Sequence, residues 1–188
     1  MTSGDSSRPG HLEPNGRLEY PIRVLFLCTG NSARSQIAEA LLVKKGGYRF
    51  LVASAGTAPA PRVREEAVTA LQALGIDWSA AKPKGIDRLV EREWDMVITL
   101  CDRSRESCAN LPSRPVTAHW GVPDPVSTDP SSVRRNAFDD TVALLSWRID
   151  LMLALRPELL EKLVLEERLL GLATAFPPSH DGNTHGAR

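Results

Sequence analysis

The sequence predicts an α/β protein with a four-stranded parallel sheet and helices on both faces. Short apolar segments that favour strands alternate along the chain with longer amphipathic segments that favour helices. The first apolar segment, residues 22–27, is apolar at nearly every position, which is typical of a strand buried on both faces. A chain of 188 residues is long enough for one domain with a sizeable core. We therefore expect a single three-layer sandwich.

Hydrophobic periodicity and stop signals place the elements along the chain. The predicted strands are residues 22–27, 49–53, 95–100 and 116–119. The predicted helices are residues 35–45, 62–74, a weaker helix at 86–93, and 131–155. Glycines end the first two helices, at Gly46-Gly47 and at Gly75. The buried faces of the second and fourth helices are predicted to be Val63, Ala67, Ala70, Leu71 and Leu74, and Phe138, Val142, Leu145, Ile149 and Met152.

The two ends of the chain differ from this central part. Residues 1–20 show no hydrophobic period, so we expect a flexible leader followed by one domain at residues 21–155. Pro157 can occupy the first position of a further helix, which predicts an additional helix at 156–174 and a flexible tail at 175–188. The leader lacks the apolar segment of a secretory signal, and no apolar run is long enough to span a bilayer. These features favour a cytoplasmic protein.

Composition narrows the classes of partner and of chemistry. Lysine plus arginine and aspartate plus glutamate both number 23, so net charge favours neither nucleic acid nor an anionic membrane surface as a partner. Three cysteines are an odd number, which does not suit a secreted disulfide framework. In a reducing compartment the three thiols are expected to be catalytic, metal-binding or simply buried.

The segment after the first strand has the features of an anion-binding loop with a nucleophile. Cys28 ends the apolar run, and Arg34 stands at the start of the next helix. Backbone N–H groups of such a loop bind tetrahedral oxyanions, and the same field favours a cysteine thiolate. Gly30 is expected to supply the unusual backbone angles. Ser35 can donate to the Cys28 sulfur. The predicted oxyanion-binding residues are Thr29, Gly30, Asn31, Ser32, Ala33, Arg34 and Ser35.

Two further reactive side chains follow other predicted strands. Cys101 comes directly after the third strand, and Asp124 comes shortly after the fourth. Because ligands of parallel sheets bind beyond the carboxyl ends of the strands, Cys28, Cys101 and Asp124 are expected to meet at one edge. The simpler alternatives are a buried structural cysteine at Cys28 and a turn cap before proline at Asp124.

These motifs resemble one known family. Residues 28–39 resemble the anion-binding loop and first helix shared by low-molecular-weight protein tyrosine phosphatases and thioredoxin-coupled arsenate reductases. The resemblance covers about residues 22–155, and it continues through the motifs Ser54-Ala55-Gly56, Gly75-Ile76-Asp77, Val97-Ile98-Thr99-Leu100-Cys101, Cys108, His119-Trp120-Gly121 and Asp124-Pro125. It implies a low-molecular-weight phosphatase-like fold.

Within this resemblance, the chain is more similar to the reductases. A phosphatase has no use for Cys101 and Cys108, and the phosphatases place two aromatic residues after their Asp-Pro, where this chain has Val126 and Ser127. The resemblance implies that the Cys28 thiolate attacks arsenate, for which phosphate or sulfate is a mimic, with Arg34 as the clamp and Asp124 as the acid. The oxidation then passes through Cys28–Cys101 and Cys101–Cys108 disulfides to thioredoxin. No metal and no bound cofactor are implied.

Several alternatives stay open on sequence alone. Cys101 and Cys108 could be one core and one surface cysteine, or zinc ligands together with His119. The enzyme could be a phosphatase acting on small phosphoesters, or an arsenate reductase that uses a low-molecular-weight thiol. A redox-sensing module that merely holds an anion is a further alternative, although it would need neither Arg34 nor Asp124.

Two local features carry expectations of their own. If residues 101–108 formed one helix, their terminal α-carbons would lie roughly 10 Å apart, farther than a disulfide allows. The segment, which carries little apolar surface, must therefore remodel between redox states, and we expect an adaptable, partly exposed loop. Some relatives bind potassium through residues matching Asn31, Glu39, Ser54 and an aspartate, and Lys84 stands at the aspartate's position. Its ammonium is expected to pair with Glu39 and to remove any dependence on potassium.

Overall fold

The computed structural model describes residues 21–105, 115–127, 131–155 and Leu159. The expected leader, the helix at 156–174 apart from Leu159, the tail and Cys108 lie outside the described residues. The strands are β1 (Ile22–Cys28), β2 (Phe50–Gly56), β3 (Met96–Thr99) and β4 (Val116–His119). The helices are α1 (Arg34–Gly46), α2 (Glu65–Gln72), α3 (Asp102–Arg105) and α4 (Ser131–Ala154), with single 3-10 turns η1 (Gly47–Arg49), η2 (Ile86–Arg88) and η4 (Pro125–Ser127).

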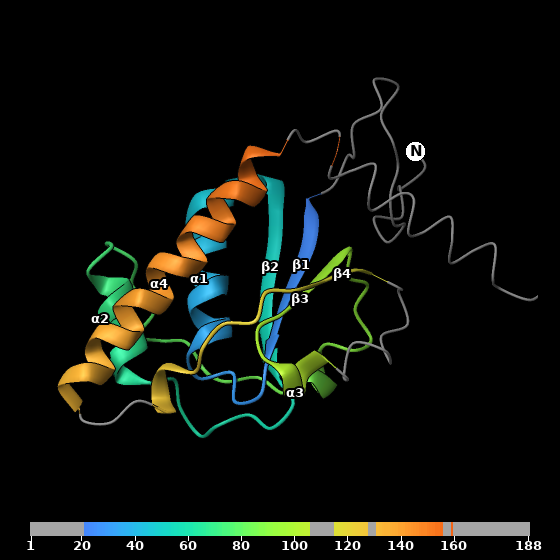
Figure 1. Ribbon diagram of the computed structural model, residues 1–188. Helices are drawn as coiled ribbons and strands as arrows, with labels where there is room; N and C mark the ends of the chain where they lie inside the picture. The colour runs from blue at the N-terminus through green and yellow to red at the C-terminus, as the bar shows by residue number, and fades with distance from the viewer. Residues whose placement is uncertain (1–20, 106–114, 128–130, 156–158, 160–188) are drawn as a thin grey trace, which may run out of the picture.

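The four strands form one parallel sheet in the order β2-β1-β3-β4, which confirms the predicted fold class. Leu27 of β1 pairs with Ala55 on one side and with Thr99 on the other, so β1 is central. The carboxyl ends of all four strands therefore meet at one edge. Figure 1 shows this lower edge, with α3 beside the loops that follow β1 and β2.

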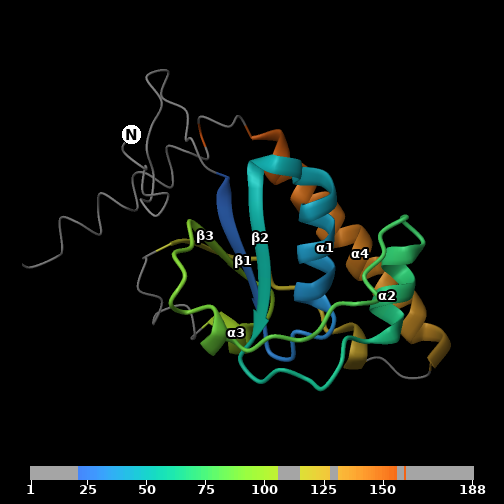
Figure 2. The same cartoon turned by 180° about the vertical axis from the view of Figure 1, so that it is seen from behind.

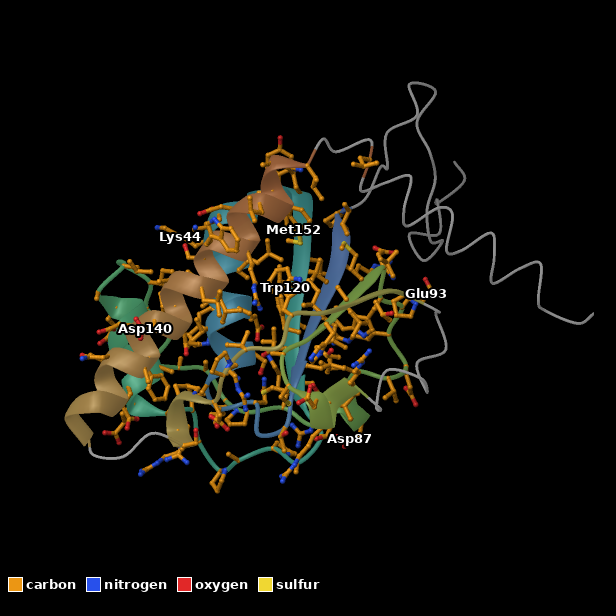
Figure 3. All side chains as sticks on the ribbon, in the orientation of Figure 1. Lys44, Asp87, Glu93, Trp120, Asp140 and Met152 are labelled. Carbon is orange, nitrogen blue, oxygen red and sulfur yellow. The ribbon has the colours of Figure 1, made fainter. Side chains whose placement is uncertain are left out.

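One face of the sheet carries most of the core. Helices α1, α2 and α4 all lie on this side, as Figure 2 shows from behind. The predicted stripe of α4 is confirmed: Phe138, Leu145 and Ile149 are fully buried, and Val142 and Met152 are nearly so. They pack against β1 residues such as Phe26 and against α1 in one continuous cluster. Figure 3 shows side chains filling the space between α4 and the sheet, with Met152 and Trp120 labelled there.

The opposite face is covered more thinly than the sequence predicts. The helix expected at 86–93 is wrong, because only the 3-10 turn η2 forms, followed by hydrogen-bonded turns. Leu89 and Trp94 nevertheless bury their side chains against Leu25 and Val97 of the sheet. The indole N–H of Trp94 donates to the Leu89 carbonyl at 3.0 Å. The apolar side chains of this segment are therefore buried by hydrogen-bonded turns, which do not require apolar residues at helical spacing.

The second helix is shorter than predicted. It begins at Glu65 and ends at Gln72, and Gly75 adopts a φ of 70° in the turn that follows. Leu74 was expected on the buried face, but it lies in this turn and is 51% exposed. The buried face is therefore confirmed for Val63, Ala67, Ala70 and Leu71 alone. In the described part of the chain, no helix is long and apolar enough to cross a membrane.

We predict that the α4 stripe dominates the stability of the domain. Phe138→Ala leaves a cavity where the ring is fully buried, and the expected loss in the free energy of unfolding is about 3–5 kcal/mol. Urea denaturation followed by circular dichroism measures it. The control Leu151→Ala changes a side chain of α4 that is 51% exposed, and about 1 kcal/mol or less is expected. Equal losses in the two variants would contradict this assignment of the core.

Candidate functional site

A cavity of about 520 Å³ lies at the carboxyl edge of the sheet. Cys28 reaches it from the end of β1, Cys101 from the residue two after β3, and Asp124 from the loop after β4. The sequence prediction that these three residues meet is confirmed. Three arginines and two aspartates take part in the wall, so its charge favours an anion. The lining residues are Cys28, Thr29, Gly30, Ser32, Ala33, Arg34, Ala60, Arg64, Cys101, Asp102, Arg103, Asp124 and Val126.

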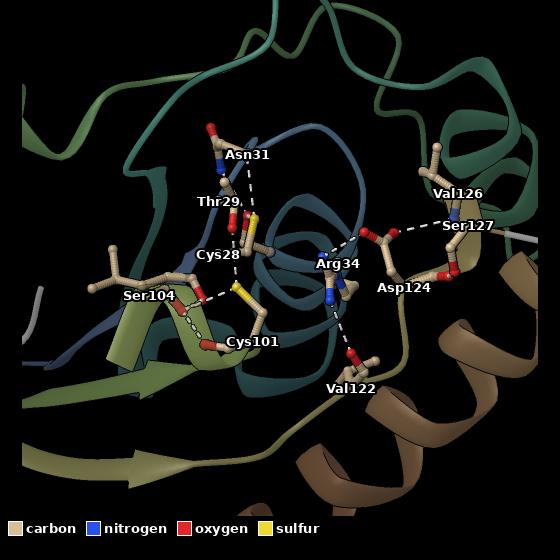
Figure 4. Close-up of polar contacts among 12 residues, drawn as sticks. Cys28, Thr29, Asn31, Arg34, Cys101, Ser104, Val122, Asp124, Val126 and Ser127 are labelled. Carbon is tan, nitrogen blue, oxygen red and sulfur yellow. Dashed lines mark hydrogen bonds and ion pairs between the residues drawn. The ribbon is translucent and has the colours of Figure 1, made fainter. Parts of the chain in front are cut away.

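Two donors hold the Cys28 sulfur at the floor of this cavity. The thiol is free and only 3% exposed. Its Sγ lies 2.9 Å from the Ser35 hydroxyl, as the sequence predicted, and accepts from the Asn31 backbone N–H at 3.2 Å. Hydrogen bonds to a sulfur anion stabilise it relative to the neutral thiol. Figure 4 shows Cys28 and Asn31 joined in this way within the loop.

The unusual backbone angle of the loop belongs to Asn31 and not to Gly30. Asn31 has a φ of 45° and is the one non-glycine residue with positive φ in the described part of the chain, whereas Gly30 does not adopt a positive φ. The expectation that Gly30 supplies this conformation is therefore wrong. Asparagine tolerates the left-handed region when its side chain is hydrogen-bonded locally. This conformation aims the Asn31 N–H at the Cys28 sulfur.

The Asn31 side chain is fully buried, and all its hydrogen-bonding capacity is used. Its Nδ2 donates to Ser35 Oγ at 2.9 Å and to Ser54 Oγ at 2.7 Å. Its Oδ1 accepts from Gln36 Nε2 at 3.0 Å and from the Lys84 backbone N–H at 2.7 Å. Four partners from α1, β2 and the segment before η2 thus hold one carboxamide, which fixes the loop in space.

The segment after β2 runs along the loop and binds its backbone. The N–H groups of Thr57, Ala58, Ala60 and Arg64 donate to the carbonyls of Cys28, Thr29, Gly30 and Ser32 at 2.8–3.2 Å. Gly56 permits this approach, since a Cβ there would lie 2.6 Å from the Thr29 oxygen. The loop carbonyls are therefore satisfied on the outside.

An internal ion pair lies behind the loop. Lys84 Nζ lies 3.0 Å from both oxygens of Glu39, and the Ser54 hydroxyl donates to Glu39 at 2.5 Å. The predicted contact between Lys84 and Glu39 is confirmed. Because Ser54 also accepts from Asn31, the pair connects to the loop through one hydroxyl. Glu39 is buried.

Arg34 and Asp124 form a second ion pair at the mouth of the cavity. Arg34 Nη2 lies 3.0 Å from Asp124 Oδ2, and Nη1 donates to the Val122 carbonyl at 3.0 Å. Figure 4 shows both contacts. Asp124 also accepts from the Val126 N–H at 3.1 Å, so it caps the turn η4 while facing the guanidinium. The turn-cap role and the contact with Arg34 thus occur in one residue.

Cys101 is a free thiol beside the loop. Its Sγ lies 3.3 Å from the Thr29 hydroxyl and 3.4 Å from the Ser104 hydroxyl. Partial burial raises the pKa of the Cys101 thiol, but hydrogen bonds with Ser104 and Thr29 and the charge of Arg34 lower it more, and the net pKa lies below its usual value. Figure 4 shows the Cys28 and Cys101 sulfurs facing the same space, with Thr29 between them.

Side chains next to Cys101 tie α3 to the sheet. His119 Nε2 lies 3.2 Å from Asp102, and its Nδ1 lies 2.8 Å from the Thr99 hydroxyl. Trp120 packs against Phe26 with ring centroids 5.9 Å apart. His119 thus contacts both α3 and β3, Trp120 packs on the sheet, and neither residue lines the cavity. Of the segment expected to remodel, α3 is a single short helix, and residues 106–114, Cys108 included, lie outside the described part of the chain.

Arg64 and Arg103 line the cavity and were not predicted from the sequence, nor were two buried or partly buried residues behind the loop, Gln36 and Trp78. Gln36 lies on α1 and is fully buried, although the sequence does not predict a buried amide at this helix position. The Trp78 indole N–H donates to its Oε1 at 2.7 Å. The available signal was the position of Gln36 in the first turn of the helix after the loop. Neither Gln36 nor Trp78 lines the cavity.

Comparison with known proteins agrees with the fold. The model of the family described as low molecular weight phosphotyrosine protein phosphatase matches residues 23–163. An arsenate reductase of Halalkalibacterium halodurans is 40% identical over 106 residues, which are 56% of this chain and 76% of that protein.

Solved structures of arsenate reductases share the fold. One described as an arsenate reductase in the phosphate binding state is 25% identical, with a TM-score of 0.60, and the match covers 71% of this chain and 97% of that one. A thioredoxin-dependent arsenate reductase of Corynebacterium glutamicum is 30% identical, with a TM-score of 0.53, over 71% of this chain and 64% of that one.

The Lys84–Glu39 pair generates a prediction about cations. The melting temperature and any turnover should be the same in sodium and in potassium chloride, because the ammonium already neutralises Glu39. Lys84→Met leaves that buried carboxylate without its cation, at an expected cost of about 1–3 kcal/mol in the free energy of unfolding. The control is Lys44→Met, at an exposed lysine of α1, which should change stability little. Stabilisation of the wild-type protein by potassium alone would contradict the assignment.

The contact between Thr29 and Cys101 generates a prediction about pH. In a protein with Cys101 as its one remaining thiol (Cys28→Ser, Cys108→Ser), Thr29→Val removes a hydroxyl that lowers the Cys101 pKa. The pH profile for alkylation by iodoacetamide should move upward, and the rate at neutral pH should fall about fivefold. Thr117→Val, on exposed β4, is the control. An unmoved profile would show that the Thr29 hydroxyl does not stabilise the thiolate.

Proposed function

The chain belongs to the low molecular weight phosphotyrosine protein phosphatase family, and we propose that it is an arsenate reductase with a three-cysteine relay regenerated by thioredoxin. One observation carries the proposal: a second free thiol, Cys101, shares the cavity with Cys28 and has a lowered pKa. Phosphate-ester hydrolysis requires one thiolate, whereas reduction of an oxyanion requires a second thiol to accept the oxidation.

The first step uses the loop and the ion pair at its mouth. The Cys28 thiolate attacks the arsenic of arsenate, an As–S bond forms, and one oxygen leaves as hydroxide. Backbone N–H groups of residues 29–35 and the Arg34 guanidinium stabilise the charge on the remaining oxygens. Asp124 is the acid that protonates the departing hydroxide to water. Its place beside Arg34 at the cavity mouth supports this role.

The resting Arg34–Asp124 pair must open for this step. An entering oxyanion competes with the Asp124 carboxylate for the same two-pronged guanidinium. When Arg34 turns to the anion, the Asp124 carboxyl is released from the guanidinium and can face the departing oxygen. Anion binding and the release of Asp124 are therefore coupled through one arginine.

The second step is the reduction itself. The Cys101 thiolate attacks the Cys28 sulfur, the As–S bond breaks, and its electron pair stays on arsenic, which leaves as arsenite. A Cys28–Cys101 disulfide forms. The Cys108 thiolate then attacks Cys101, releases Cys28 as thiolate and leaves a Cys101–Cys108 disulfide. The dithiol of thioredoxin reduces that disulfide and becomes oxidised.

Two alternative activities are distinguished from this one by the assay described below. A phosphatase acting on small phosphoesters would use Cys28, Arg34 and Asp124 alone. A low-molecular-weight thiol could replace thioredoxin as the electron donor. Val126, a small side chain that lines the cavity after Asp124, supports a small inorganic anion over an aromatic ester.

We predict the following pattern for arsenite production with thioredoxin, thioredoxin reductase and NADPH. Cys28→Ser, Cys101→Ser and Cys108→Ser should each abolish multiple turnover. Asp124→Asn should lower kcat by about 10²–10⁴-fold, since it removes the acid. Asp140→Asn, at an exposed carboxylate of α4, is the matched control and should retain the wild-type rate.

Hydrolysis of p-nitrophenyl phosphate is measured in parallel. Phosphatase turnover that survives Cys101→Ser and Cys108→Ser, with no arsenite formed by the wild-type protein, would overturn the proposal in favour of the phosphatase. Full turnover with a low-molecular-weight thiol and none with thioredoxin would overturn the electron donor.

A further inference from the structure

The polar network behind the loop continues beyond Asn31 to Gln36, a polar side chain at a buried position. Gln36 lies in the first turn of α1 and is fully buried. Its Nε2 donates to Asn31 Oδ1 at 3.0 Å and to the Lys82 carbonyl at 3.2 Å, and its Oε1 accepts from Trp78 Nε1 at 2.7 Å. Three parts of the chain thus meet on one amide.

Burying an amide is costly unless its hydrogen bonds are made, so an apolar residue would fill this helix position more cheaply. Gln36 does not line the cavity, so contact with the anion does not explain it. What distinguishes it from an ordinary core residue is its partner Asn31, whose backbone N–H reaches the Cys28 sulfur. Trp78 thereby connects to Cys28 in three contacts, through Gln36 and then Asn31.

The direction of each donor explains what Gln36 contributes. Asn31 Oδ1 has two acceptor positions, filled by Gln36 Nε2 and the Lys84 N–H. These two donors fix which end of the carboxamide is oxygen, and so they direct Nδ2 toward Ser35 and Ser54. With the side chain held at both ends, the Asn31 backbone stays at a φ of 45°. Loss of Gln36 removes one of the two donors to Oδ1 and so weakens the restraint on the conformation that aims the Asn31 N–H at Cys28.

We propose that Gln36 is a positioning residue for the Cys28 nucleophile, with Trp78 as its anchor. The inference rests on the proposed function only in taking Cys28 as the attacking thiol. Gln36 acts through Asn31: it keeps one of the two donors on the Cys28 sulfur in place. Trp78, which is partly exposed, sets the orientation of the Gln36 amide from outside.

The test uses a protein in which Cys28 is the one remaining thiol (Cys101→Ser, Cys108→Ser), and it measures alkylation by iodoacetamide as a function of pH. Gln36→Met keeps the size of the side chain and removes its amide. It should slow alkylation at neutral pH about tenfold and move the half-maximal rate to higher pH. Trp78→Phe removes one N–H and should give a smaller effect in the same direction. Gln72→Met, at an exposed glutamine of α2, is the matched control with no effect.

A structural role alone predicts a different result. Gln36→Met would then lower the melting temperature, while the alkylation profile of the folded protein would match the parent, and that result overturns the inference. Should Gln36→Met fail to fold, Gln36→Leu, which has no donor to Asn31, and Trp78→Phe carry the same test. An unmoved profile in both also overturns it. Because alkylation needs no arsenate, a shifted profile in a protein that forms no arsenite would sustain this inference while the proposed function fails.

Discussion

The geometry of the site depends on one buried carboxamide, the side chain of Asn31. The Asn31 side chain makes four hydrogen bonds in the interior, and they keep its backbone at a φ of 45° that few side chains adopt. Through its own N–H, that backbone faces the Cys28 sulfur. The loop therefore has its shape before any anion enters, and the free energy for this order comes from folding. A preorganised loop of this kind can stabilise charge without rearranging at the moment of reaction.

Two ion pairs with opposite roles flank that carboxamide. The Lys84–Glu39 pair lies behind the loop, where Glu39 is buried and Ser54 connects it to Asn31, and neither residue of the pair lines the cavity. The Arg34–Asp124 pair lies at the mouth, and Asp124 is 46% exposed. In each pair one side chain is buried and the other is partly exposed: Arg34 is 11% exposed and Asp124 46%, while Glu39 is 10% exposed and Lys84 34%. What separates the two pairs is their position: the pair behind the loop supports it, and the pair that lines the cavity is where an entering oxyanion can reach Arg34.

The alternation of strands and helices was sufficient to predict the sheet and to place Cys28, Cys101 and Asp124 at one edge, since parallel strands end together. Local detail was harder to predict. The segment around Leu89 looks helical because its apolar residues are spaced closely, yet long-range contacts with Leu25 and Val97 bury it as turns. The positive φ was expected at Gly30 and not at Asn31, because the intrinsic tolerance of glycine for this conformation can be recognised from the sequence alone. The four partners of Asn31 come together only in the fold.

The central claim is that a second sulfur accepts the oxidation that Cys28 receives. The most direct measurement is a single turnover of the Cys108→Ser protein with one equivalent of arsenate and no reductant, followed by alkylation of remaining thiols and peptide mapping. The account predicts one equivalent of arsenite and a disulfide between Cys28 and Cys101. Arsenite released while Cys101 is still recovered as an alkylated thiol, or no disulfide between these two residues, would contradict it.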